Sequence, residues 1–145
     1  MERLTRHLNN GTSSTALKSY LTTIRKWAPQ GPVIHIDDSD VVKPDGYKFE
    51  ALGLVRDGSK CTVSKTVYGK GYHVTEACVL TKNNHPVSIF SEIHSSKEKF
   101  FTSINDVTFS AMERGATLFG KATFAMDIGY DDNKMFLKLD ELEQN

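Results

Sequence analysis

The chain has 145 residues, a quarter of them charged, and its 18 basic and 18 acidic side chains give a formal net charge of zero. This length fits one domain, or part of one, with a modest core. No apolar run approaches the roughly 18 residues of a membrane span, so we expect no membrane partner. The charged start is unlike a secretory signal, and Cys61 and Cys78 lack metal-ligand spacing. Both features favour a reducing, cytoplasmic compartment.

Charge is unevenly distributed along the chain. Residues 1–30 hold five basic side chains and one acidic one, whereas residues 127–145 hold six acidic side chains and two lysines. Such asymmetry can mark a face for nucleic-acid phosphates, although solvated surface charge is its more frequent cause.

Residues 1–30 are expected to form a helical lead-in segment. Ser13 or Ser14 can cap a helix that Pro29 and Pro32 stop. Its apolar residues recur at helical spacing, at Leu17, Tyr20, Leu21, Ile24 and Trp27. A packing helix explains this pattern better than a recognition helix. Its basic residues Lys18, Arg25 and Lys26 could still contact phosphate from the opposite face.

The stretch from Val33 to Asp40 is an apolar run that ends in three carboxylates. β-Branched residues dominate its first half, which predicts a buried strand over residues 33–38. A carboxylate at the end of a core strand needs a compensating partner, and a bound divalent cation is a common one. The plainer interpretation is a strand that runs out into an acidic turn.

Two further strands are predicted after a loop or ragged hairpin over residues 49–67. Residues 72–81 form the first of these strands, and Asn83-Asn84-His85 turns the chain back into the second, over residues 86–94. Together with residues 33–38 they predict a three-strand antiparallel meander. Four histidines, at positions 35, 73, 85 and 94, have no metal-site spacing and are interpreted as ordinary strand or surface residues.

The remaining pieces predict a helix, a strand and a second helix. Ser103 can cap a helix that runs to about Leu118, and residues 123–127 supply a short strand that again ends in Asp. A crossover connection places this strand parallel to the first one, so that Asp38 and Asp127 meet at one edge of an α/β sheet. An Asp-Asn cap then opens a helix over residues 134–142.

Four blocks of the sequence resemble the DDE-type insertion-sequence transposases of the IS-four-like group. They keep their order and approximate spacing between Gly31 and about Leu139. The blocks are Asp37-Asp38-Ser39-Asp40-Val41-Val42-Lys43-Pro44-Asp45-Gly46, Arg56-Asp57-Gly58-Ser59, Lys70-Gly71-Tyr72-His73-Val74 and Met126-Asp127-Ile128-Gly129-Tyr130-Asp131. The resemblance implies a ribonuclease H-like mixed sheet. Residues 31–145 would be the N-terminal half of such a catalytic domain, incomplete at its C-terminus.

The resemblance also implies the chemistry. Such enzymes hydrolyse DNA phosphodiesters and transfer strands with Mg²⁺ or Mn²⁺, and their partners are transposon ends, target DNA and a second copy in the complete protein. The implied setting is the prokaryotic cytoplasm, at the nucleoid. The family pattern places the catalytic Asp directly before a small hydroxyl residue, which selects Asp38, followed by Ser39, and the second ligand would be Asp127. Strand alternation by itself leaves Asp37 and Asp38 both open.

The chain departs from the family pattern in two ways. The usual Asp-Arg-Gly-Tyr appears as Asp127-Ile128-Gly129-Tyr130, which removes a positive charge. The third carboxylate, a Glu on a downstream helix, should lie beyond this chain, because Glu141 and Glu143 come too soon. We therefore expect a truncated transposase, or a non-catalytic remnant that binds DNA or another transposase chain. A metal-dependent nuclease of the same fold with another substrate is a third hypothesis, which a preference for RNA–DNA hybrids would support.

Overall fold

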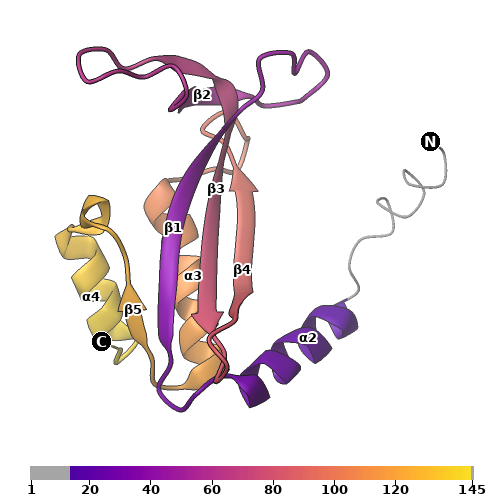
Figure 1. Cartoon of the computed structure of the whole chain (residues 1–145), viewed down its shortest axis with the longest axis vertical. Helices are drawn as coiled ribbons and strands as arrows, with labels where there is room; N and C mark the ends of the chain where they lie inside the picture. The colour runs from indigo at the N-terminus through magenta and orange to yellow at the C-terminus, as the bar shows by residue number, and fades with distance from the viewer. Residues whose placement is uncertain (1–13, 145) are drawn as a thin grey trace.

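The computed structural model (Figure 1) describes residues 14–144, so that Ser13 and the rest of the start of the lead-in segment lie outside the described residues. The elements are, in order, α2 (Ser14–Trp27), β1 (Val33–Val42), β2 (Gly53–Arg56), β3 (Tyr68–Leu80), β4 (Pro86–His94), α3 (Ile104–Phe119), β5 (Thr123–Ala125), the short 3₁₀ helix η1 (Ile128–Tyr130) and α4 (Asn133–Glu141). No helix within residues 14–144 is long and apolar enough to cross a membrane.

The strands form one mixed sheet. β3 lies between β1 and β4 and is antiparallel to both, and β2 pairs with the start of β3. β5 pairs with β1 in parallel, with Ile34 opposite Phe124. The predicted α/β class, the antiparallel meander and the parallel strand after a helix are therefore confirmed. The structure adds β2, which lies within the segment expected to be a loop or ragged hairpin.

The ends of two strands differ from the prediction. β1 continues to Val42, so Asp38 lies within a strand and not at its end. The extension is non-local, because residues 39–42 pair with residues 71–74 of β3. Asp40 adds side-chain contacts to the neighbouring strands: its Oδ2 accepts the backbone N–H of Arg56 at 2.9 Å, and its Oδ1 lies 2.6 Å from Nδ1 of His73. β5, in contrast, ends at Ala125, two residues before Asp127.

Helix α3 covers one face of the sheet and closes the core (Figure 1). Ser103 is its N-cap, as predicted, because its Oγ accepts the backbone N–H of Asp106 at 3.2 Å. The helix lies close to β1 and β5 at Gly115, where an added Cβ would be only 2.5 Å from Cδ1 of Ile34. The core beneath the helix is built mainly of Ile34, Ile36, Ala77, Val79, Ile89, Ala111, Met112 and Phe124.

Helix α2 lies at one end of the sheet, against α3 and β4 (Figure 1). Of its predicted apolar face, only Leu21 and Ile24 are buried. Leu17, Tyr20 and Trp27 keep large exposed fractions, because the helix rests on the end of the sheet and not across it. The prediction of a packing helix is therefore confirmed for two of its five apolar positions.

Candidate functional site

Asp38 and Asp127 line the same cavity, which has a volume of about 380 Å³. The cavity lies where the middle of β1, the start of α3, η1 and the start of α4 meet. Its other polar walls come from Asp37, Asn105, Tyr130 and Asp132. The structure thus brings together the two residues that the sequence singled out, although 88 residues separate them in the chain.

Asp38 continues the buried face of β1 toward the cavity. Ile34 and Ile36 on that face are fully buried, and Asp38, the next residue on it, is half-buried. Alternation turns the Asp37 side chain to the other face of the strand, where it is exposed, although the residue still contributes to the cavity wall. The half-buried position favours Asp38 as the carboxylate that the core orients.

A buried hydroxyl holds one oxygen of Asp38. Thr75 lies directly opposite Asp38 on β3, is fully buried, and donates its hydroxyl proton to Asp38 Oδ1. The Thr75 oxygen also lies 2.8 Å from Nε2 of His94, which is 1% exposed. Sequence reasoning missed Thr75 and set His94 aside, because only the strand register shows that Thr75 lies opposite Asp38 and that His94 reaches Thr75.

Asp127 is held by the turn that follows β5. Its Oδ1 accepts the backbone N–H of Gly129 at 2.7 Å and so caps η1. A Cβ on residue 129 would lie 2.9 Å from this oxygen, which explains why glycine suits the position. Ile128, the residue between Asp127 and Gly129, is 89% exposed.

The hydroxyl of Tyr130, a residue of the cavity wall, is buried. No hydrogen bond of acceptable geometry reaches it from the described residues, although Asp38 is its main charged neighbour. Burial, followed by the carboxylates of Asp38, Asp37 and Asp127, raises the pKa of Tyr130 far above its ordinary value. The hydroxyl therefore stays neutral and keeps its proton available for donation.

The cavity is strongly acidic. Four aspartates line it, and none of the described residues in its wall is basic. Asp38, Asp127 and Asp132 each use Oδ1 to accept a hydrogen bond from the protein, from Thr75, Gly129 and Lys134 respectively. Within residues 14–144 no hydrogen bond joins the protein to Oδ2 of Asp38 or of Asp127, although the Tyr130 hydroxyl interacts with the Asp38 carboxylate. Each of these two carboxylates is therefore fixed through one oxygen and keeps the other available.

The donor set fits a hard divalent cation in one specific mode. Within residues 14–144, no group of three or more His, Cys, Asp or Glu side chains is arranged to hold a metal ion. Mg²⁺, however, keeps several of its waters and is usually bound through one or two carboxylates together with substrate phosphates. The two carboxylates suit that mode of binding, whereas a site made only of protein ligands is not formed by the described residues.

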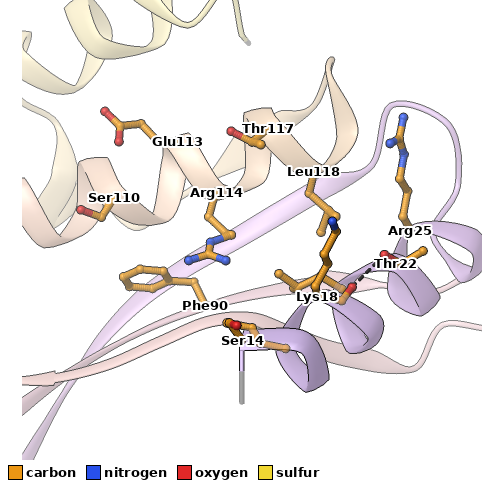
Figure 2. Close-up of a pocket in the computed structure, with 12 residues that line it drawn as sticks. Ser14, Lys18, Thr22, Arg25, Phe90, Ser110, Glu113, Arg114, Thr117 and Leu118 are labelled. Carbon is orange, nitrogen blue, oxygen red and sulfur yellow. Dashed lines mark hydrogen bonds between the residues drawn. The ribbon is translucent and has the colours of Figure 1, made fainter. Parts of the chain in front are cut away.

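A larger, separate cavity of about 620 Å³ lies between α2 and α3 (Figure 2). Lys18 and Arg25 extend into it from α2, and Arg114 extends from α3 toward Phe90. None of these three cations forms an ion pair within the described chain, and the one acidic wall residue, Glu113, pairs with Lys138 at 2.7 Å. Two of the three basic residues that the sequence analysis noted on α2, Lys18 and Arg25, therefore share one basic groove with Arg114.

The comparisons with known proteins give no relative. No family model matches the chain, and no curated protein or solved structure matches it. Function is therefore inferred from the residues of the site.

Proposed function

We propose that this chain carries two catalytic carboxylates, Asp38 and Asp127, of a DDE-type DNA transposase with a ribonuclease H-like fold. One observation carries the proposal: the two aspartates that the motifs select line one acidic cavity, each with one oxygen held by the protein and one left available. The order of the elements supports the same fold, since a three-strand meander is followed by a helix and by a strand parallel to the first.

Asp38 and Asp127 would hold Mg²⁺ or Mn²⁺ in this cavity. When bound, such ions activate an attacking water or 3′-hydroxyl and stabilise the leaving oxygen of a phosphodiester. The residues of the chain set the conditions for this chemistry. Because the described wall is acidic, it repels a DNA phosphate until cations neutralise it. We therefore expect DNA to enter this cavity only when a divalent cation is present.

The positions of Ile128 and of the basic groove suggest which surface would contact DNA. The position that is Arg in the family carries an exposed apolar side chain here, so this turn offers no cation to a phosphate. Lys18, Arg25 and Arg114 offer three cations on another part of the surface. We propose that this groove contacts the DNA backbone through charge, without reading sequence.

Nicking of supercoiled plasmid DNA in Mn²⁺ or Mg²⁺ tests the catalytic proposal. We expect nicking that requires the divalent ion and is lost in both Asp38→Asn and Asp127→Asn. Asp45→Asn is the matched control, because Asp45 is an exposed residue in the turn after β1 and lies outside the cavity. Nicking that survives Asp38→Asn would contradict the assignment of this residue.

The second candidate is a non-catalytic remnant that binds DNA or another transposase chain. Two observations favour it: within residues 14–144 no group of three or more His, Cys, Asp or Glu side chains is arranged to hold a metal ion, and Ile128 stands in place of Arg. In that case the protein binds DNA without nicking it, and Asp38→Asn leaves the DNA affinity unchanged. The same experiment therefore separates the two functions.

A further inference from the structure

The Asp38 carboxylate is the end of a buried chain of three side chains. Thr75 connects it to His94, and the three residues come from the adjacent strands β1, β3 and β4. We propose that Thr75 and His94 are positioning residues, which hold the Asp38 carboxylate so that its free Oδ2 is presented to a divalent cation in the cavity. This inference rests on the proposed function, because it concerns the same carboxylate.

The direction of the hydrogen bonds follows from the chemistry of the three groups. An ionised carboxylate only accepts, so the single hydroxyl proton of Thr75 goes to Asp38 Oδ1. The Thr75 oxygen can then only accept in its contact with Nε2 of His94, at 2.8 Å. His94 must therefore carry its proton on Nε2, which leaves Nδ1 as an unprotonated acceptor.

The surroundings of His94 fix this arrangement. Its ring stacks with those of His73 and Phe101, with centroids 5.6 Å apart in each pair and interplanar angles of 22° and 8°. Nδ1 is buried and has no hydrogen-bond partner among the described residues. A buried acceptor without a partner is unfavourable and calls for an explanation. Here the ring donates its Nε2 proton to the Thr75 oxygen, and burial in this position removes Nδ1 from solvent.

Thr75→Val tests the chain by removing only the hydroxyl from a side chain of the same shape. Partners of this kind, one step removed from a metal, usually change metal affinity by about 10- to 100-fold when they are lost. We expect Thr75→Val to weaken Mn²⁺ binding by about that factor, as measured by electron paramagnetic resonance. Thr75→Ser keeps the hydroxyl and should bind Mn²⁺ nearly as the wild type does.

Thr108→Val is the matched control. Thr108 is also fully buried, but its hydroxyl bonds to the carbonyl of Ile104 within α3 and does not reach Asp38. The Thr108→Val variant should unfold at a lower temperature than the wild type, as Thr75→Val should. Its Mn²⁺ affinity, however, should equal that of the wild type. His94→Gln retains an N–H donor and should bind Mn²⁺ better than His94→Leu, which has none. This pair keeps the test decisive if Thr75→Val does not fold.

The tautomer of His94 gives a readout that needs no metal. Nitrogen NMR of the imidazole should show the proton on Nε2 in the wild type, and a proton on Nδ1 would overturn the inference. If the wild type binds Mn²⁺ and Thr75→Val binds it equally well, the positioning role is wrong while the proposed function stands. If the wild type binds no Mn²⁺, the proposed metal site itself fails, and the inference fails with it.

Discussion

The close approach of α3 to the sheet can be tested by adding one methyl group. In Gly115→Ala the new Cβ would lie 2.5 Å from Cδ1 of Ile34 and 3.1 Å from two ring atoms of Phe124. Carbon atoms pack best at about 3.5–4.0 Å, so the helix or Ile34 must shift by about 1 Å. Ile34 is fully buried, so any movement of its side chain is into surrounding core residues.

The magnitude is a balance of two effects. Overpacking a well-packed core destabilises by about 1–3 kcal/mol. Replacing Gly with Ala within a helix contributes about 1 kcal/mol in the opposite direction. We therefore expect Gly115→Ala to lower the free energy of unfolding by about 1 kcal/mol, measured by equilibrium unfolding in urea. Gly58→Ala is the control, because no atom lies within 4 Å of its added Cβ and no strain is expected.

A double-mutant cycle identifies the atom responsible. Ile34→Val removes Cδ1 and by itself costs about 0.5–1.5 kcal/mol. In the double variant the new methyl group fills the space that Cδ1 leaves, so the two effects should couple favourably by about 1 kcal/mol. If Gly115→Ala is as stable as the wild type and the two changes are simply additive, the reasoning about α3, β1 and β5 is refuted.

Two other predictions concern charge. Burial is the main cause that lowers the pKa of His94 below its ordinary value of 6.5, so the unfolded state binds more protons than the folded state below about pH 6.5. The free energy of unfolding should therefore fall as the pH is lowered from 7 through 6.5 toward the pKa of the folded state. It should fall less steeply in His94→Gln. Equal slopes of this free energy against pH in the two proteins would contradict the buried neutral ring. The second prediction concerns the basic groove. Replacing Lys18, Arg25 and Arg114 with Ala in one triple variant should remove about three phosphate contacts. The slope of log DNA affinity against log salt concentration should then become shallower by about 2.7. A triple replacement of the lysines at positions 43, 70 and 97, which line another cavity, should change it less, and the reverse ranking would place the DNA elsewhere.

Local signals in the sequence were enough to predict much of the fold. Ser103 and Asp132 cap helices where their hydroxyl and carboxylate chemistry predicted caps. The apolar runs before Asp38 and Asp127 gave the two parallel strands, and the motifs gave the two aspartates that line one cavity. These features depend on a few neighbouring residues, which is why a single sequence reveals them.

Features set by contacts between distant segments could not be predicted. The extension of β1 beyond Asp38 rests on pairing with β3, where Ser39 lies opposite Val74 and Val42 opposite Gly71. Thr75 is one residue in a mostly apolar strand, and its importance follows only from its register opposite Asp38. The partial burial of α2 likewise depends on where the helix meets the sheet, since its periodicity alone suggests a fully covered face.

Titration with Mn²⁺ tests the central claim most directly, namely that Asp38 and Asp127 together hold a divalent cation. The number of bound ions and their affinity would be measured by electron paramagnetic resonance for the wild type, Asp38→Asn, Asp127→Asn and the control Asp45→Asn. We expect the wild type and the control to bind Mn²⁺ equally, and each of the two cavity variants to bind it at least about 10-fold more weakly. Binding that is unchanged in either cavity variant would contradict a shared site.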